Sequence, residues 1–149
     1  MFDLVFQNST SDKKYTSKFF EKILLTGISE LKLSKKNIEV SVSLVGEGKI
    51  KELNKKYRNK NKITDVLSFP MSEKSVIRNS KFVIQDLGDI FICLSFAKKE
   101  AKSENIDIET KLAQLTVHGF LHLLGYDHER SIKDAKEMFG LENKILGKL

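Results

Sequence analysis

The chain has 149 residues, of which 40% are hydrophobic and 31% are charged. That composition is typical of a soluble globular protein, and the length suits one domain spanning residues 1–149. The 26 lysines and arginines outnumber the 20 aspartates and glutamates, which gives a net charge of +6 and favours polyanionic partners such as nucleic acid.

Two features predict a cytoplasmic protein without membrane contact. Residues 1–7 lack the basic start and apolar run of a signal peptide, and no segment approaches the roughly 20 apolar residues that cross a bilayer. The only cysteine, Cys93, excludes an intramolecular disulfide and lies in an apolar run, so we expect it to be a small buried residue.

The first elements follow from hydrophobic periodicity. Residues 2–6 predict a strand, and residues 15–31 predict a helix with one apolar face. Strict alternation over residues 38–44 predicts a strand with one buried face. The inward residues of the helix are expected to be Phe20, Leu24, Ile28 and Leu31.

The next helix, expected over residues 49–57, belongs to the most basic segment of the chain. Ile50, Leu53 and Tyr57 share one face, which we expect to point inward while the basic residues point outward. Glu52 is the only acid between residues 49 and 62. The basic residues there are Lys49, Lys51, Lys55, Lys56, Arg58, Lys60 and Lys62.

The middle of the chain predicts two strands. Residues 66–69 form a short apolar segment that Pro70 ends or marks as an edge strand. Residues 71–86 are ambiguous and allow either a hairpin or a flap. Residues 89–94 are apolar on both faces, as in an inner strand, and residues 95–103 have a helical pattern.

The longest helical pattern runs from residue 107 to residue 124. Asp107 suits the N-cap, and the pattern from Leu112 onward is apolar nearly all round, so we expect this helix to be central. Gly125 is placed to end it in a left-handed conformation.

A last helix is predicted after Ser131, which can cap its first turn together with Asp134. Helices and strands are mixed without the repeated units of a barrel. We therefore predict an α+β fold with a small mixed sheet of about four strands packed against helices. The residues expected to be buried on the last helix are Ile132, Ala135, Phe139 and Leu146.

All three histidines of the chain fall within eleven residues. His118 and His122 are four residues apart on the long helix, so they project from one face on successive turns. A chain that reverses at Gly125 can bring His128 beside them. Three imidazoles with an open fourth position form the site of a catalytic zinc ion, so we predict one Zn²⁺ per chain on these residues.

The spacing equals that of the metzincin zinc helix, H-E-x-x-H-x-x-G-x-x-H, including its glycine. The exception is Gly119, which stands where that pattern has glutamate. The glutamate is the general base of the peptidase reaction, and glycine cannot replace it. The sequence thus predicts the metal geometry without the peptidase mechanism.

Three blocks of sequence resemble the bacterial YbeY family. The run HGFLHLLGYDH over residues 118–128 is similar to the family signature. Tyr57-Arg58 followed by TDVLSFP over residues 64–70 resembles its central segment, and LGDI over residues 87–90 resembles the strand after it. The blocks occur in the family's order.

The resemblance implies a zincin-like core and a single-strand-specific, metal-dependent endoribonuclease. It also implies action in 16S ribosomal RNA maturation and quality control of the small ribosomal subunit. The expected partners are precursor ribosomal RNA and that subunit, with no DNA and no membrane. We expect His118 and Arg58 to be catalytic, because the planar guanidinium of Arg58 suits phosphate.

Several roles stay open at this point. Arg58 could instead be a solvated surface residue, and Asp127 could either accept a bond from a ligand imidazole or stabilise the turn. Asp65 and Asp89 could support the site or the fold, and the general base is not identified. Three imidazoles also suit copper, nickel or iron.

Two other functions compete with RNA hydrolysis. A zinc peptidase or amidase is the first, and Gly119 argues against it. A non-enzymatic ribosome-assembly factor with a structural zinc is the second. Structural sites usually have four protein ligands and often cysteine, whereas only three ligands occur here and Cys93 is distant in sequence.

Overall fold

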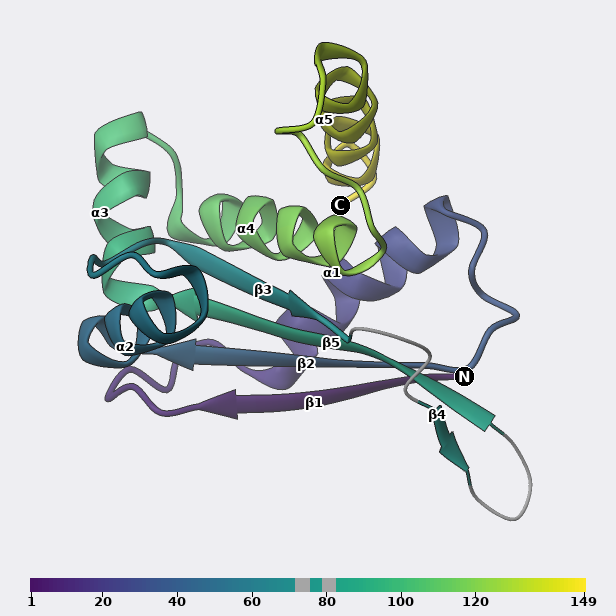
Figure 1. The fold of residues 1–149 in the computed structure, drawn as a ribbon, viewed down its shortest axis with the longest axis horizontal. Helices are drawn as coiled ribbons and strands as arrows, with labels where there is room; N and C mark the ends of the chain where they lie inside the picture. The colour runs from purple at the N-terminus through teal and green to yellow at the C-terminus, as the bar shows by residue number, and fades with distance from the viewer. Residues whose placement is uncertain (72–75, 79–82) are drawn as a thin grey trace.

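The computed structural model describes residues 1–71, 76–78 and 83–149 and confirms the α+β prediction (Figure 1). Helices and strands occur where the periodicity predicted them, with ends shifted by a few residues. The elements are β1 (Phe2–Asn8), α1 (Ser17–Glu30), β2 (Ile38–Val45), α2 (Glu47–Arg58), β3 (Val66–Pro70), β4 (Val76–Arg78), β5 (Val83–Cys93), α3 (Leu94–Glu104), α4 (Ile108–Leu123) and α5 (Ile132–Leu146).

The strands form one mixed sheet in the order β1-β2-β5-β3, with β4 paired to β5. The pairs β1·β2 and β2·β5 are parallel, whereas β3 and β4 run antiparallel to β5. β5 is therefore an inner strand and β3 an edge strand, as predicted. For residues 71–86, the β4·β5 pairing matches the hairpin alternative; residues 72–75 and 79–82 lie outside the described part.

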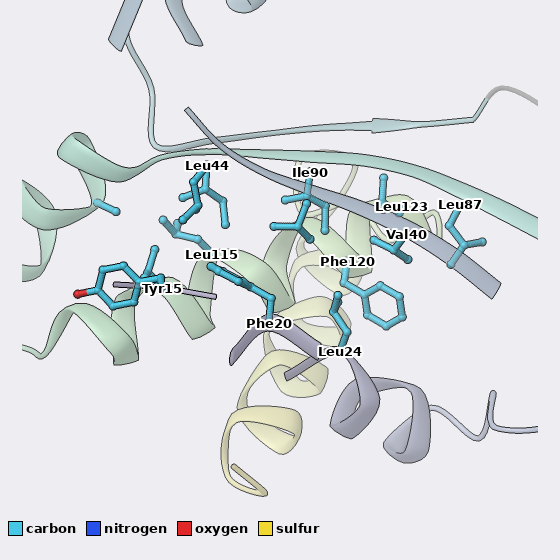
Figure 2. Close-up of a cluster of buried hydrophobic side chains, with 14 of the residues drawn as sticks. Tyr15, Phe20, Leu24, Val40, Leu44, Leu87, Ile90, Leu115, Phe120 and Leu123 are labelled. Atoms are coloured by element: carbon cyan, nitrogen blue, oxygen red, sulfur yellow. The ribbon is translucent and has the colours of Figure 1, made fainter. Parts of the chain in front are cut away.

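The main core lies between one face of the sheet and helices α1, α3 and α4 (Figure 2). Val40 and Ile90 of the sheet meet Phe20 of α1 and Phe120 of α4, and all four are at most 1% exposed. Each such burial stabilises the fold by roughly 1.5–3 kcal/mol. α4 is buried nearly all round, as predicted, because α5 packs on the side away from the sheet (Figure 1).

A close approach between α4 and β5 depends on Gly119. A Cβ atom at this position would lie 2.9 Å from Cγ2 of Ile90, which is fully buried. This is tighter than carbon atoms can pack without a shift of the structure. Gly119 is thus a packing residue, and a side chain of any size there would push the helix away from the sheet.

Helix α2 packs with the opposite face of the sheet, where Ile50 and Leu53 join Leu67 in a second cluster. Successive side chains of a strand point to opposite faces, so Leu67 and Phe69 face α2 while Ser68 faces α4. The prediction that Tyr57 points inward is wrong, since the residue is 57% exposed. It lies in the last turn of α2, beyond the part that Ile50 and Leu53 anchor.

The prediction for the buried face of α5 is correct only in part, since Leu146 is partly buried against the α4–α5 cluster. Ile132 and Phe139 are 79% and 47% exposed, whereas Met138 and Ile145 are fully buried. Residues seven apart share a helix face, and this stripe packs on α4, leaving Ile132 and Phe139 outside. The predicted cap is confirmed, because Oγ of Ser131 accepts a bond from the backbone N–H of residue 134 at 3.0 Å.

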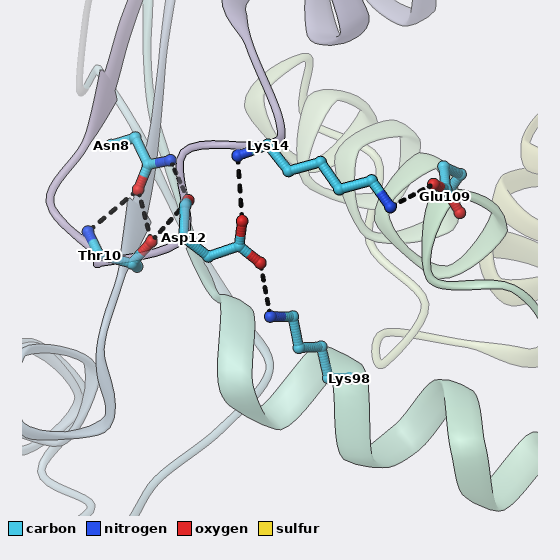
Figure 3. A network of polar contacts seen from close by, with 6 residues as sticks. All are labelled: Asn8, Thr10, Asp12, Lys14, Lys98 and Glu109. Atoms are coloured by element: carbon cyan, nitrogen blue, oxygen red, sulfur yellow. Dashed lines mark hydrogen bonds and ion pairs between the residues drawn. The ribbon is translucent and has the colours of Figure 1, made fainter.

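Polar contacts fix the loop between β1 and α1 against two helices (Figure 3). Asp12 accepts a bond from Nζ of Lys98 in α3 at 2.7 Å, and Asn8 donates to the backbone carbonyl of Asp12 at 2.8 Å. Lys14 reaches Glu109 in α4 at 4.0 Å.

None of the helices in the described parts of the chain is long and apolar enough for a membrane crossing.

Candidate metal centre

The C-terminal end of α4 reverses the chain with a Schellman turn. Gly125 has a φ of +99°, the left-handed conformation predicted from the sequence. Its N–H donates to the carbonyl of His122 at 3.0 Å, and the N–H of Tyr126 donates to the carbonyl of Leu121 at 3.1 Å. This turn brings residues 126–130 back along the end of the helix.

The reversal brings the three histidines together. The Nε2 atoms of His118 and His122 lie 3.1 Å apart, and one nitrogen from each of the three rings lies within 4.8 Å of the others. The rings of His118 and His122 have centroids 4.6 Å apart, and His128 lies 5.2–5.3 Å from both. A tetrahedral zinc ion with ordinary Zn–N bonds needs nitrogens roughly 3.3 Å apart, so the cluster fits with small side-chain shifts.

A second observation also fits a metal. The Nδ1 atom of His128 is buried and has no hydrogen-bond partner. A buried polar atom without a partner is costly, and a metal ion beside it would remove that cost. Within the described residues, the cluster contains these three side chains and no fourth histidine, cysteine or carboxylate. A four-coordinate metal ion held by these residues would keep one position for water or substrate.

Glu142 of α5 supports the cluster from behind. Its Oε1 lies 2.5 Å from Nδ1 of His118, and its side chain is only 16% exposed. Because Nδ1 faces this carboxylate, Nε2 of His118 is the atom left to bind a metal, and Nε2 is the atom that faces His122.

The sequence analysis missed Glu142. It is 24 residues from His118 and follows no ligand spacing. A signal did exist, because Glu142 is a charged residue on the helix face shared by Met138 and Ile145. A carboxylate on an apolar stripe needs a buried partner.

The electrostatics of the cluster favour a neutral imidazole at His122. Burial lowers the pKa of His122, and the neighbouring His118 and His128 lower it further. A neutral imidazole is the form that binds a metal ion. Cys93 is fully buried and belongs to the cluster beside α2, so it behaves as the small apolar residue that was predicted.

Arg58 lies at the free edge of β3. Its Nη2 donates to the backbone carbonyl of Ser68 at 2.7 Å, and its Cζ lies 5.3 Å from the ring centroid of Phe69. β3 also packs against α4, the helix that carries two of the histidines. The guanidinium is therefore held at the strand edge, with four of its five N–H groups free of this bond.

Some hydrogen-bonding groups of the same edge are unavailable to an added peptide strand. The outward carbonyl of Ser68 is occupied by Arg58, the outward N–H of Val66 donates to Asp65 at 2.7 Å, and Pro70 has no N–H. Peptides that extend a sheet depend on such edge groups. This arrangement therefore argues against a peptidase, as does the packed glycine at position 119.

The aspartates considered in the sequence analysis serve the backbone or other residues. Asp127 accepts a hydrogen bond from the N–H of Glu129 at 2.8 Å, and this bond stabilises the turn that contains His128. Asp65 binds the start of β3. Burial raises the pKa of Asp89, an effect partly offset by a hydrogen bond from Ser41.

Comparison with known proteins gives consistent matches over almost the whole chain. Residues 5–149 match the family described as Endoribonuclease YbeY. Proteins of that name from Persephonella marina and Staphylococcus carnosus are each 39% identical, over 142 and 148 residues, covering 95% and 98% of this chain and 89% and 95% of theirs.

A solved structure agrees with these sequence matches. The solution structure of TM1509 from Thermotoga maritima superimposes with a TM-score of 0.64 at 32% identity, covering 96% of this chain and 86% of that one. The resemblance noted from three short blocks thus extends across the fold. The chain belongs to the Endoribonuclease YbeY family.

Proposed function

We propose that this protein is a metal-dependent endoribonuclease that hydrolyses single-stranded RNA. The observation that carries the proposal is the cluster of three imidazoles with an open fourth position, found in a chain of this family. We further propose that its substrates are precursors of 16S ribosomal RNA on the small ribosomal subunit, and that it acts in the cytoplasm.

The roles of the residues follow from their positions. His118, His122 and His128 would hold one zinc ion, and Glu142 orients the first of them. A zinc ion held there would lower the pKa of a water molecule toward 7 and polarise a phosphoryl oxygen. Arg58 would bind a phosphate of the RNA with the N–H groups that do not bond to the carbonyl of Ser68.

RNA suits the charge of the molecule better than a peptide does. The exposed face of α2 and the loop after it carry the basic segment from Lys49 to Lys62. Lysines and arginines on a surface of this kind bind phosphates and release counterions, which makes affinity fall with salt. The engaged groups at the edge of β3 argue against peptide binding by strand addition.

The proposal is tested by offering the zinc-loaded protein three substrates: a single-stranded RNA, the same RNA in a duplex, and casein. We expect cleavage of the single strand, little cleavage of the duplex and none of casein. The His118→Ala/His122→Ala variant is the matched control, and it should lose both metal and activity. Cleavage of casein, or RNA cleavage that survives in the control, would overturn the proposal.

Arg58 separates phosphate binding from metal binding. Arg58→Ala should retain its zinc and reduce RNA cleavage by about a hundredfold or more, in line with losing one donor to a developing negative charge. Arg58→Lys should recover only part, because it keeps the charge and loses the fork. Lys22→Ala, an exposed lysine on α1 outside the basic segment, is the control. Wild-type cleavage by Arg58→Ala would remove this residue from the mechanism.

A further inference from the structure

Tyr57 is an exposed aromatic residue with a fixed ring. It lies in the last turn of α2 and is 57% exposed. Its ring packs against Phe69 of β3, with centroids 5.2 Å apart and planes tilted by 60°. Phe69 is in turn packed against Phe91 at 5.8 Å. These partly buried neighbours contact the ring, and more than half of the Tyr57 side chain stays exposed beyond them.

The surroundings of Tyr57 are basic. Nζ of Lys56 lies 5.2 Å from the centroid of the Tyr57 ring, and Cζ of Arg58 lies 5.3 Å from that of Phe69. Among the described side chains, Lys55, Lys56, Arg58, Lys60 and Lys62 form no ion pair with an acid, whereas Lys49 pairs with Glu52. Exposed aromatic surface with unneutralised basic groups around it is the combination that binds single-stranded nucleic acid.

The position of this surface relative to the metal centre fixes its role. Phe69 and Tyr57 lie on the face of the sheet that α2 covers, and Ser68 points to the face that α4 covers. Arg58 lies between them, at the edge of β3. A single strand of RNA that crosses the edge of β3 would pass Tyr57, then Arg58, and continue toward α4, the helix that carries His118 and His122.

We propose that Tyr57 and Phe69 form a stacking surface for one base of single-stranded RNA, at a nucleotide distant from the cleaved bond. This inference rests on the proposed function, because it assumes that the same strand reaches the metal centre. Stacking of a base on Tyr57 positions the RNA strand, while Arg58 and the lysines of the basic segment bind its phosphates. The surface accepts any base, since every base has an aromatic face.

Binding to metal-free protein tests the surface without hydrolysis. A single-stranded RNA carrying 2-aminopurine is titrated with the wild type, Tyr57→Phe and Tyr57→Ala. We expect Tyr57→Phe to bind within about twofold of the wild type and to quench the fluorescence equally. Tyr57→Ala should raise Kd by roughly tenfold or more and lose much of the quenching. Leu25→Ala, an exposed apolar residue on α1, is the matched control and should change neither.

Two further measurements distinguish stacking from charge or folding. The slope of log Kd against log salt should be the same for Tyr57→Ala and wild type, because no phosphate contact is lost. With an abasic RNA of the same length, Tyr57→Ala should cause no further loss of affinity. If the wild type cleaves RNA but Tyr57→Ala binds RNA as tightly as the wild type does, only this inference is overturned. A wild type that neither binds nor cleaves RNA would overturn the proposed function as well.

Discussion

The contact between Glu142 and His118 can be tested by removing the carboxylate. Its Oε1 lies 2.5 Å from Nδ1 of His118 and is largely shielded from water. A hydrogen bond to a charged group contributes about 1.5–3 kcal/mol, which corresponds to roughly 10- to 150-fold in an equilibrium constant. Residues that orient a metal ligand typically change metal affinity by about 10- to 100-fold, so the two estimates agree.

We therefore expect Glu142→Ala to raise the Kd for zinc by about 10- to 100-fold. Glu142→Gln should cause a smaller loss, because the amide oxygen still accepts a bond while the charge is gone. Glu137→Gln is the matched control, since it removes the same charge from an exposed position of the same helix. The three variants are compared by competition against a fluorescent zinc indicator, a measurement that does not depend on RNA cleavage.

The order of affinities decides the question. The account predicts wild type and Glu137→Gln tightest, then Glu142→Gln, then Glu142→Ala. If Glu142→Ala binds zinc as tightly as Glu137→Gln does, the contact has no role in holding His118, and α5 contributes only packing to the metal centre.

Two further predictions concern stability. Gly119→Ala should lower the free energy of unfolding by about 1–2 kcal/mol in urea denaturation, because the contact with Ile90 outweighs the gain in helix propensity. In the Ile90→Ala background the same substitution should raise the free energy of unfolding relative to Ile90→Ala alone. Stabilisation by Gly119→Ala in the presence of the native Ile90 would contradict the packing argument. Burial is the main cause that raises the pKa of Glu100 from 4.5 to about 7, and a hydrogen bond with Asp65 is the second. Between these two pH values the folded state retains a proton on Glu100 that the unfolded chain has lost. Stability should therefore fall as pH rises from about 4.5 to 7, and Glu100→Gln should raise Tm at pH 8 but not at pH 4; equal shifts at both pH values would contradict the assignment.

Much of the fold could be predicted because its burial pattern is regular. The alternation from Ile38 to Leu44 predicts a strand with one buried face, and the apolar pattern from Leu112 onward predicts a central helix. The clustering of the three histidines could also be predicted, because the helix repeat sets the first two and Gly125 sets the reversal. These are local geometric constraints, which sequence spacing records directly.

The wrong predictions concern choices that periodicity leaves open. The apolar residues of α5 form two overlapping stripes, and only packing on α4 selects the one with Met138 over the one with Phe139. Tyr57 follows the helical repeat of α2 but lies past the end of the face that the sheet covers. Glu142 depends on a tertiary contact that no spacing encodes.

The most direct test of the account is a titration of metal-free protein with zinc while single-turnover cleavage of a single-stranded RNA is followed. The account predicts no cleavage at zero metal, a linear rise to one equivalent of zinc per chain, and a plateau beyond it. The His118→Ala/His122→Ala variant should stay inactive throughout the titration. Cleavage by the metal-free protein, or a rise that the double variant shares, would contradict the claim that the three histidines hold the metal that cuts RNA.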